Sequence, residues 1–259
     1  TMEEADAALR DMLLDDKFGH GKVVVEDWLE GPEFSFMCFV DRRRVYPMAL
    51  AQDHKRAYDG DEGPNTGGMG AVSPVPFVDE AFMGEVIRTI VEPTVEGLRK
   101  DGIDYKGFIF IGLMNVGGKP YVIEYNVRMG DPETEVVFPR IESDLIDLFE
   151  AIAFGRLDRH ELVVSPRTAV TVVCVSGGYP GEYAKGMEIS GLGKPSDSIV
   201  FHAGTSAKGA KVLTAGGRVL AVTSFGDGIE QAAAASYRTI ETIDYQGKYC
   251  RTDIGRDLL

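Results

Sequence analysis

Residues 52–70, QDHKRAYDGDEGPNTGGMG, form a long polar segment in a chain whose other segments alternate between apolar strands and amphipathic helices. The segment places Asp, Lys and Arg side chains beside a glycine-rich run and contains almost no apolar side chain for a core to bury. Such a composition makes a poor core element but offers charged groups and accessible backbone amides. The segment is therefore a candidate ligand site.

A second polar cluster, VIEYNVRMGDPET, covers residues 122–134 and begins as a strand. Residues two apart on a strand share a face, so Glu124 and Asn126 point the same way, and Arg128 extends the row if the strand continues. A carboxylate beside an amide oxygen at a strand end suits Mg²⁺ or Mn²⁺. The alternative is an ion pair between Glu124 and Arg128, with Asn126 ending the strand.

The run PNTGGMG at residues 64–70 has three glycines. Their backbone N–H groups are expected to be free to approach an anion, and Asn65 and Thr66 add side-chain hydrogen bonds. The run lacks the GxxxxGK[ST] spacing of a Walker A loop. An ordinary surface loop is the simpler interpretation.

Two cations, Lys55 and Arg56, lie just before this run in an otherwise acidic protein. They favour capture of a carboxylate or phosphate. Asp53 is positioned to orient one of them or to bind a substrate amine. His54 has no partner at a recognisable spacing and is interpreted as structural.

Two further acidic turns remain open to a structural or a functional interpretation. The Gly130-Asp131-Pro132-Glu133 turn reads as a helix start, with Asp131 as the cap and Pro132 at the first helical position. Glu133, near Arg128, can also place charge on a substrate. Glu26 and Glu33 flank a Trp-Leu-Glu-Gly turn that suits a nucleotide-binding hinge, although surface carboxylates are the commoner explanation.

Composition restricts the class of protein. The 259 residues suffice for one large domain or two modest ones. The net charge of −14 argues against general binding to nucleic acid or anionic membranes, but not against an anionic substrate in a local basic pocket. Cys38, Cys174 and Cys250 show no CxxC spacing and are expected to be reduced. Without a signal peptide or a run approaching roughly 20 apolar residues, a cytoplasmic protein is expected.

Hydrophobic periodicity predicts a mixed α and β chain. Thr1 and Glu4 are expected to form a capping box at the start of the first helix. Pro93 is expected to interrupt the helix predicted over 79–100. Gly117-Gly118 is expected to form the turn of a β-hairpin. Helices are predicted over 1–16, 79–100, 143–154 and 227–243, and strands over 22–28, 34–40, 44–50, 107–115, 120–126, 169–175, 198–203 and 218–224. Residues 52–76 are predicted to be a loop. The sequence contains no GxSxG motif and no activated cysteine, so it predicts no nucleophile.

Four segments together are recognisable: VVVEDWLEGPEFS, PMALAQDHKRAYDGDEGPNTGGMGAVSP, YKGFIFIGLM and VIEYNVRMGDPET. In this order they closely resemble the phosphoribosylamine–glycine ligase family of the ATP-grasp superfamily. The resemblance extends from near Thr1 to the Asp-Ile-Gly close to the C-terminus. QDHKR followed by GPNTGGMGA is specific to this family, whereas ATP-grasp enzymes generally share the Glu-x-Asn strand.

The resemblance implies an α+β fold with an ATP-grasp core, in which helices accompany an antiparallel sheet, and a small α+β C-terminal domain. The implied domains are a remnant of the lid subdomain at 1–27, the catalytic core at 28–160 and the C-terminal domain at 161–259. The family's Rossmann-like N-terminal domain and the first half of its ATP-grasp unit are absent. The chain is therefore expected to be a fragment, inactive without its partner, the missing N-terminal part of the same enzyme.

The resemblance also implies the activity. ATP would convert glycine to glycyl phosphate, and the amine of 5-phosphoribosylamine would attack it to give glycinamide ribonucleotide, ADP and phosphate in de novo purine biosynthesis. Catalysis would be electrostatic, with Mg²⁺ or Mn²⁺ on the ATP phosphates and cationic side chains beside them. The implied roles are metal ligation by Glu124 and Asn126; nucleotide binding by Glu26, Leu29 and Glu33; substrate binding by Asp53, Lys55, Arg56, Asn65, Thr66, Gly67, Gly68, Asp131 and Glu133; and catalysis by Arg128, Lys55 and Asp131.

Two alternatives stay open from the sequence. Another ATP-grasp carboxylate–amine ligase, or a relative of biotin carboxylase, would share the nucleotide chemistry but use a different acceptor. A nucleotide-binding module without catalysis is the other. The family-specific loops argue against the first, and the intact row of Glu124, Asn126 and Arg128 argues against the second.

Overall fold

The computed structural model describes residues 1–14, 21–42 and 44–259, which divide into two compact units, Thr1–Glu30 and Gly31–Leu259. In the first unit, helix α1 (Met2–Leu13) begins with the predicted capping box. The Glu4 amide donates to Thr1 Oγ1 at 3.2 Å, and the Thr1 amino group donates to the Glu4 carboxylate at 2.7 Å. The end of the predicted helix, at residues 15 and 16, lies outside the described residues.

The strand predicted over 22–28 is wrong. Residues 21–30 form neither helix nor strand, and Val24 and Val25 are 76% and 84% exposed. A strand needs a partner for its backbone N–H and C=O groups, and the described residues of this unit contain no second strand. Apolar, β-branched residues were therefore insufficient to specify a strand here.

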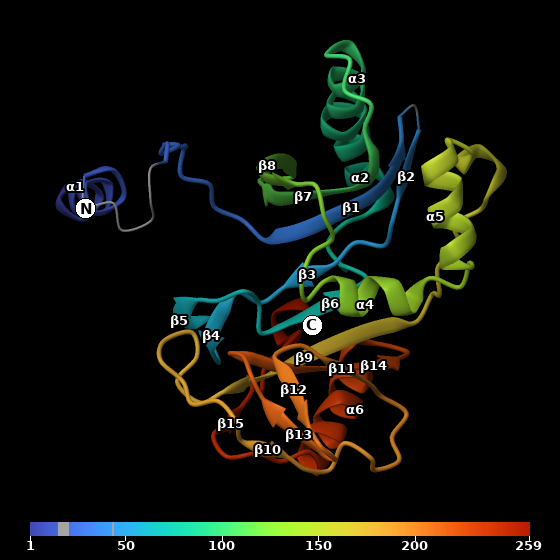
Figure 1. The fold of residues 1–259 in the computed structure, drawn as a ribbon. Helices are drawn as coiled ribbons and strands as arrows, with labels where there is room; N and C mark the ends of the chain where they lie inside the picture. The colour runs from blue at the N-terminus through green and yellow to red at the C-terminus, as the bar shows by residue number, and fades with distance from the viewer. Residues whose placement is uncertain (15–20, 43) are drawn as a thin grey trace. The chain divides into compact units, whose positions relative to one another are not determined.

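In the second unit, an antiparallel four-stranded sheet has the order β2-β1-β7-β8 (Figure 1). Its strands are β1 (Glu33–Asp41), β2 (Val45–Pro47), β7 (Lys106–Val116) and β8 (Lys119–Asn126). The hairpin predicted at Gly117 and Gly118 is confirmed, with φ of +58° and +84°. The β1–β2 hairpin is confirmed too, although β2 stops at Pro47 and the turn residue Arg43 lies outside the described residues.

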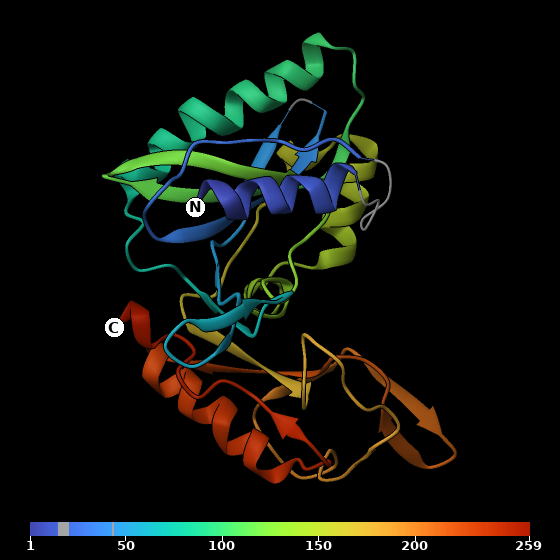
Figure 2. The ribbon, with the colours of Figure 1, turned by 90° about the vertical axis from the view of Figure 1, so that its left-hand side faces the viewer.

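Helices pack against both faces of this sheet, and successive side chains of β1 point alternately into the two apolar cores on either side of it. Phe34 and Phe36 join one apolar cluster with Val86, whereas Phe39 joins another with Leu148. The helices are α2 (Glu80–Val86), a π-helical turn (Ile87–Val91), α3 (Glu92–Lys100) and α5 (Leu145–Phe154) (Figure 2). The interruption expected near Pro93 is confirmed as this π-helical turn, and Asp144 is the N-cap residue of α5.

A second sheet contains two short parts of the segment predicted as a loop. Its order is β11-β14-β9-β6-β3, and β15 also pairs with β9. The strands are β3 (Gln52–Asp53), β6 (Gly70–Ser73), β9 (Thr168–Ser176), β11 (Ile199–His202), β14 (Arg218–Gly226) and β15 (Lys248–Tyr249). The prediction of a continuous loop over 52–76 is wrong because β6 is fully buried against β9. The strands predicted over 169–175, 198–203 and 218–224 are confirmed.

The remaining elements surround this second sheet. They are the hairpin β4 (Arg56–Tyr58) and β5 (Glu62–Asn65), the sheet of β10 (Glu188–Ile189), β12 (Thr205–Lys208) and β13 (Lys211–Thr214), and helices α4 (Thr134–Val137) and α6 (Ile229–Thr242). Short 3-10 turns cover Phe138–Arg140, Leu157–Arg159 and Arg256–Leu258. Helix α6, predicted over 227–243, packs on β9 and β14 (Figure 2).

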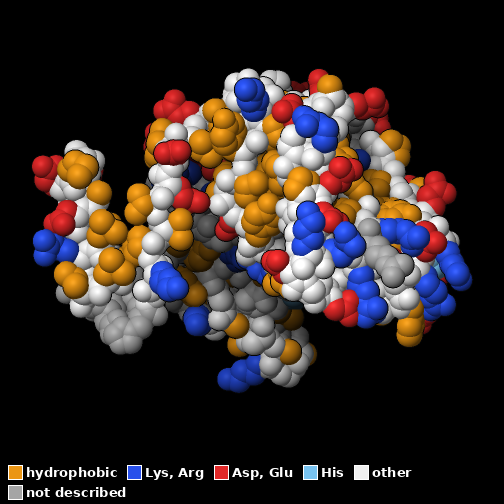
Figure 3. Space-filling view, turned by 90° about the horizontal axis from the view of Figure 1, so that it is seen from above, with side chains coloured by type: hydrophobic (Ala, Val, Ile, Leu, Met, Phe, Trp, Pro, Cys, Tyr) orange, Lys and Arg blue, Asp and Glu red, His pale blue; other side chains and the backbone are white. Residues whose placement is uncertain are grey.

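Because β6 pairs with β9, residues on the two sides of the predicted boundary at 160 share one sheet, and the three-domain division remains a prediction. The three cysteines are free thiols, as expected. Among the described residues, no helix is both long and apolar enough to cross a membrane. Acidic and basic side chains are mixed on the face seen in Figure 3, although the chain carries a net charge of −14.

Candidate functional site

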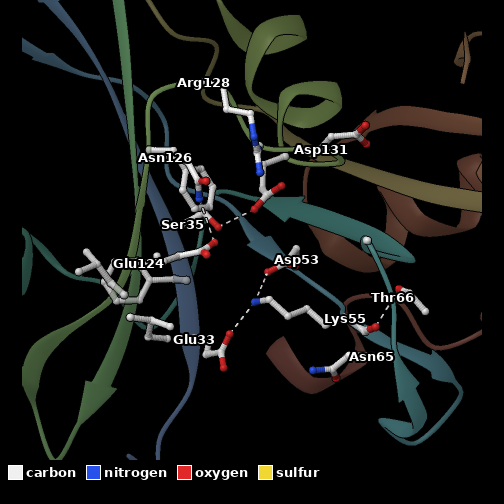
Figure 4. A pocket seen from close by; sticks show the side chains of 18 residues that line it. Glu33, Ser35, Asp53, Lys55, Asn65, Thr66, Glu124, Asn126, Arg128 and Asp131 are labelled. Atoms are coloured by element: carbon white, nitrogen blue, oxygen red, sulfur yellow. Dashed lines mark hydrogen bonds and ion pairs between the residues drawn. The ribbon is translucent and has the colours of Figure 1, made fainter. Parts of the chain in front are cut away.

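A cavity of about 430 Å³ brings the two polar clusters of the sequence together (Figure 4). Strands β1, β7 and β8 supply part of its lining, and β3, the polar segment that follows it through β5 to Gly67, and the turn before α4 supply the rest. Its polar lining comprises Glu33, Ser35, Asp53, Lys55, Asn65, Thr66, Glu124, Asn126, Arg128, Asp131 and Glu133. Most of the predicted site residues therefore meet in one place.

Lys55 links two carboxylates at this cavity. Its Nζ donates to Glu33 Oε2 at 2.5 Å and to Asp53 Oδ1 at 3.1 Å. Burial opposes the charge of the ammonium group, but the attraction of Asp53 and Glu33 prevails and raises the pKa of Lys55. The prediction that Asp53 orients a neighbouring cation agrees with this geometry.

Glu133 is the most deeply buried carboxylate of the cavity, at 4% exposure. Ser35 Oγ donates a hydrogen bond to Glu133 Oε1 at 2.7 Å. Burial, and secondarily the negative charge of Asp53, raises the pKa of Glu133. Ser35 was missed in the sequence because it lies within an otherwise apolar strand, whose alternation alone gives no sign of a polar partner.

Glu124 and Asn126 lie side by side at the end of β8, as predicted. Asn126 Nδ2 donates to Glu124 Oε1 at 3.0 Å, which leaves the amide oxygen of Asn126 and the second oxygen of Glu124 as hard ligands of the kind Mg²⁺ prefers. The alternative ion pair is not formed in the described structure, where Arg128 donates to the Met129 carbonyl at 2.8 Å. The residues present thus fit a divalent cation.

The glycine-rich run does not offer the free amides that its sequence predicted. The Thr66 amide donates to the Lys55 carbonyl at 2.8 Å, the Gly67 amide to the Tyr179 hydroxyl at 3.1 Å, and the Gly68 amide to Thr66 Oγ1 at 2.9 Å. These hydrogen bonds fix the run instead of leaving its N–H groups for an anion. Substrate contacts by Thr66, Gly67 and Gly68 remain predictions.

Gly68 has a packing role that requires glycine. Its φ is +113°, and a Cβ atom there would lie 2.4 Å from Pro132 Cδ. The run and the 130–133 turn are thus in direct contact. The turn itself differs from its prediction, because α4 starts at Thr134 with Glu133 as its N-cap residue and Asp131 lies before the helix.

Arg218 is a second residue that the sequence did not reveal. Its guanidinium lies 3.0 Å from the Asp131 carboxylate and donates to the Gly67 carbonyl at 2.7 Å. Arg218 begins β14, more than eighty residues after Asp131 in the chain, so no local spacing signals the pairing. It joins the glycine-rich run to the acidic turn from a third element.

Two predicted residues of the unit Gly31–Leu259, Arg56 and Gly68, do not line the cavity. Arg56 donates to the Gly63 carbonyl at 2.8 Å, within the β4–β5 hairpin, and lines a neighbouring cavity. Glu26 and Leu29 belong to the unit Thr1–Glu30, where Glu26 is exposed and Leu29 half-buried. Their contact with a nucleotide remains a prediction.

Comparison with known proteins identifies relatives along almost the whole chain. The profile of the phosphoribosylglycinamide synthetase ATP-grasp (A) domain matches residues 1–134, and that of the C domain matches residues 169–257. The phosphoribosylamine–glycine ligases of Vibrio cholerae and Pseudomonas aeruginosa are 47% and 48% identical over 98% of this chain. The chain spans about 60% of the length of these curated relatives.

Solved structures agree on the fold. The phosphoribosylamine–glycine ligase of Thermotoga maritima has a TM-score of 0.89 and 35% identity, covering 98% of this chain and 63% of that protein. The biotin carboxylase domain of Hydrogenobacter thermophilus 2-oxoglutarate carboxylase, with a TM-score of 0.60 and 15% identity over 86% of this chain, supports the fold alone. The predicted α+β class with an ATP-grasp core is confirmed. With the A-domain profile matching about half of the residues and the C-domain profile most of the remainder, the chain belongs to the phosphoribosylglycinamide synthetase family.

Proposed function

We propose that this chain supplies the metal- and substrate-binding part of a phosphoribosylamine–glycine ligase. The observation that carries the proposal is the meeting of two motifs at one cavity: Lys55 and Asp53, from the family-specific QDHKR segment, and the Glu124–Asn126 pair common to ATP-grasp enzymes. Family membership supports the same assignment. A cytoplasmic location belongs to this proposal as well.

The proposed reaction has two steps. A carboxylate oxygen of glycine attacks the γ-phosphorus of ATP, the bond to ADP breaks, and glycyl phosphate forms. The amine nitrogen of 5-phosphoribosylamine then attacks the glycyl carbonyl carbon and loses a proton, and phosphate leaves with the electrons of the broken C–O bond. The products are glycinamide ribonucleotide, ADP and phosphate.

The cations of the cavity suit this chemistry because phosphoryl transfer gains most from positioning and from charge stabilisation. Lys55 and Arg128 would offset negative charge on the transferring phosphoryl group. Asp131 would contribute to substrate binding and catalysis from the 130–133 turn, where its carboxylate pairs with Arg218. Glu133 and Asp53 would contact the substrates, with Asp53 available to the glycine ammonium group.

Glu124 and Asn126 would hold Mg²⁺ or Mn²⁺, which when bound neutralises and orients phosphate oxygens. The described residues contain no group of three or more His, Cys, Asp or Glu side chains that could hold a metal ion. Two protein ligands suffice for Mg²⁺ in a nucleotide site, since water and phosphate oxygens complete its coordination. The nucleotide base and ribose would contact Glu26, Leu29 and Glu33.

The test is the release of ADP and the formation of glycinamide ribonucleotide in the presence of Mg²⁺, ATP, glycine and freshly generated 5-phosphoribosylamine. It is run on this chain and on the chain joined to the N-terminal part that its relatives possess. We expect activity in the longer protein and none in residues 1–259 alone. Glu124→Gln is expected to abolish it, whereas Glu188→Gln, an exposed control on β10, retains it.

Two results would overturn the proposal. If the longer protein releases ADP with another carboxylate and amine but not with glycine and 5-phosphoribosylamine, the chain belongs to a different ATP-grasp ligase. If it binds ATP without any turnover, it is a nucleotide-binding module. Substantial glycine-dependent turnover by the 259 residues alone would overturn the expectation that further sequence is needed.

A further inference from the structure

The C-terminal residues 251–257 lie against the start of the polar segment 52–70, where Asp257 contacts both neighbours of Asp53. Asp257 Oδ2 accepts a hydrogen bond from Gln52 Nε2 at 2.7 Å, and Asp257 Oδ1 lies 2.9 Å from His54 Nε2. Gln52 and His54 are 9% and 4% exposed. The Asp257 carboxylate, together with the Gly255 amide 3.2 Å from the same His54 nitrogen, thus holds two buried polar side chains that flank Asp53.

Strand geometry connects this contact to the cavity. Side chains alternate between the faces of an extended chain, so Gln52 and His54 share one side while Asp53 and Lys55 share the other. Asp53 and Lys55 line the cavity of about 430 Å³ and Gln52 and His54 do not, while all four residues line the neighbouring cavity. Any rotation of this short segment would move both sets of side chains together.

Backbone hydrogen bonds support this segment on one side, because the Met69 amide donates to the His54 carbonyl at 2.7 Å and the Thr66 amide donates to the Lys55 carbonyl at 2.8 Å. Strand β3 is two residues long, with Asp53 opposite Ala71. Beyond it, the His54 amide donates to the Gly70 carbonyl at 2.9 Å. Lys55 then reaches toward Glu33 (Figure 4). The contacts of Gln52 and His54 with Asp257 add side-chain anchors to this backbone pairing.

The segment that carries Asp257 is itself fixed to α6. Ile254 is 2% exposed, and its amide donates to the Tyr237 hydroxyl at 3.2 Å. Gly255 has a φ of +83°, and a Cβ atom there would lie 2.7 Å from Ile229 Cγ2. A continuous set of contacts thus extends from helix α6 through Asp257 to the strand beside the cavity.

We propose that Asp257 is a positioning residue, which holds Gln52 and His54 so that Asp53 and Lys55 face the cavity. This proposal deepens the proposed function and rests on it for its catalytic consequence, though not for its structural one. The Asp257 side chain is itself 51% exposed, so its removal opens no core cavity. Asp257 does not line the cavity of about 430 Å³; it acts on Asp53 and Lys55 through the β3 segment.

The structural test measures Lys55 directly. Carboxylates raise the pKa of Lys55, and each unit by which that pKa falls increases the reactive free-amine fraction about tenfold. We expect Asp257→Ala to loosen Lys55 from Glu33 and Asp53 and to increase its acetylation rate at least about threefold, measured by mass spectrometry. Asp257→Asn, which keeps one acceptor, should give a smaller increase.

The control uses an unrelated lysine pair. Glu188→Ala removes the partner of Lys211, whose Nζ lies 2.6 Å from Glu188, and should raise labelling of Lys211 while leaving Lys55 unchanged. If Asp257→Ala lowers the melting temperature but leaves labelling of Lys55 unchanged, Asp257 has a structural role alone and the positioning proposal is wrong.

The catalytic test uses the longer protein of the preceding section. Asp257→Ala should raise the KM for glycine more than it lowers kcat, and Asp257→Asn should restore part of the loss. Ligation that is unaffected by Asp257→Ala would refute positioning while leaving the proposed function intact. An absence of ligation in the unaltered protein would instead refute the proposed function, and the labelling of Lys55 would still decide the role of Asp257.

Discussion

The segment around Lys55 and the end of strand β8 line the same cavity but are held in different ways. Lys55 and its neighbours depend on distant residues, including Asp257 and Arg251, the latter bonded to the Arg56 carbonyl. Glu124 bonds to Asn126, two residues away. The first region is held by tertiary contacts and the second by its own strand, so we expect changes in the remote contacts to affect folding and changes at β8 to affect chemistry.

The largest expected loss of stability comes from Arg251, which is 3% exposed and forms two bonds of 2.8 and 3.0 Å with the Asp253 carboxylate. Arg251→Met would leave that carboxylate without its cation, at a cost of about 3 kcal/mol in the free energy of unfolding. Urea denaturation at pH 7 measures it. A loss below about 1 kcal/mol would show that remote contacts matter less than we propose.

The pH dependence of this loss supplies a second check. Burial opposes ionisation of Asp253, but Arg251 and the Gly60 amide overcome it and lower the pKa of Asp253 to about 2, from 3.8. Because the folded-state pKa lies below the unfolded value, the stabilisation is complete above pH 4 and disappears as the pH falls toward 2. The difference between Arg251→Met and the unaltered protein should narrow over that range.

Gly68 tests the contact between the glycine-rich run and the 130–133 turn. Gly68→Ala introduces a Cβ atom 2.4 Å from Pro132 Cδ at a φ of +113°, and we expect it to cost about 2 kcal/mol. Gly193→Ala is the matched control, since a Cβ atom there has no neighbour within 4 Å. Equal stabilities of the two variants, measured by thermal unfolding, would contradict this account.

These contacts explain what the sequence could and could not predict. The β7–β8 hairpin, the capping box of α1 and the Glu124–Asn126 pair depend on residues close in the chain, and all were predicted. Ser35, Arg218 and Asp257 act on partners 98, 87 and 203 residues away. Periodicity and spacing carry no information about such pairs, so the composition of the cavity was predictable but its supports were not.

The same reason accounts for the wrong predictions. Residues 52–76 lack a continuous apolar pattern, yet β6 becomes a buried strand because β9, about a hundred residues later, pairs with it. Residues 22–28 have the apolar pattern of a strand but no partner strand within the described part of their own unit. Strand formation depends on a partner that local sequence does not show.

Glu135, near the turn that joins the two regions, should have a moderate effect. One of its carboxylate oxygens is buried without a hydrogen-bond partner in the described structure, and burial, followed by the charge of Asp131, raises its pKa to about 7. A raised folded-state pKa favours the protonated form, so the contribution of Glu135 to stability falls as the pH rises from 4.5 to 7.

Glu135→Gln should therefore remove this part of the pH dependence and stabilise the protein at pH 8 by about 1 kcal/mol, a value reduced for solvent screening. Unfolding in urea at pH 5 and pH 8 measures both effects. A variant whose stability changes with pH in the same way as the unaltered protein would show that Glu135 ionises normally.

The smallest expected effect on folding accompanies the largest on activity. Glu124 is exposed and bonds to Asn126, so Glu124→Gln should change the free energy of unfolding by less than about 0.5 kcal/mol. The longer protein should nevertheless lose binding of a Mg²⁺–nucleotide, measured by calorimetry, because an amide is a weaker metal ligand than a carboxylate. Manganese binding, followed by electron paramagnetic resonance, gives a readout that does not require turnover. Unchanged metal and nucleotide binding in Glu124→Gln would remove Glu124 from the proposed metal site. A loss of stability as large as that of Arg251→Met would show that the end of β8 depends on more than contacts within its own strand.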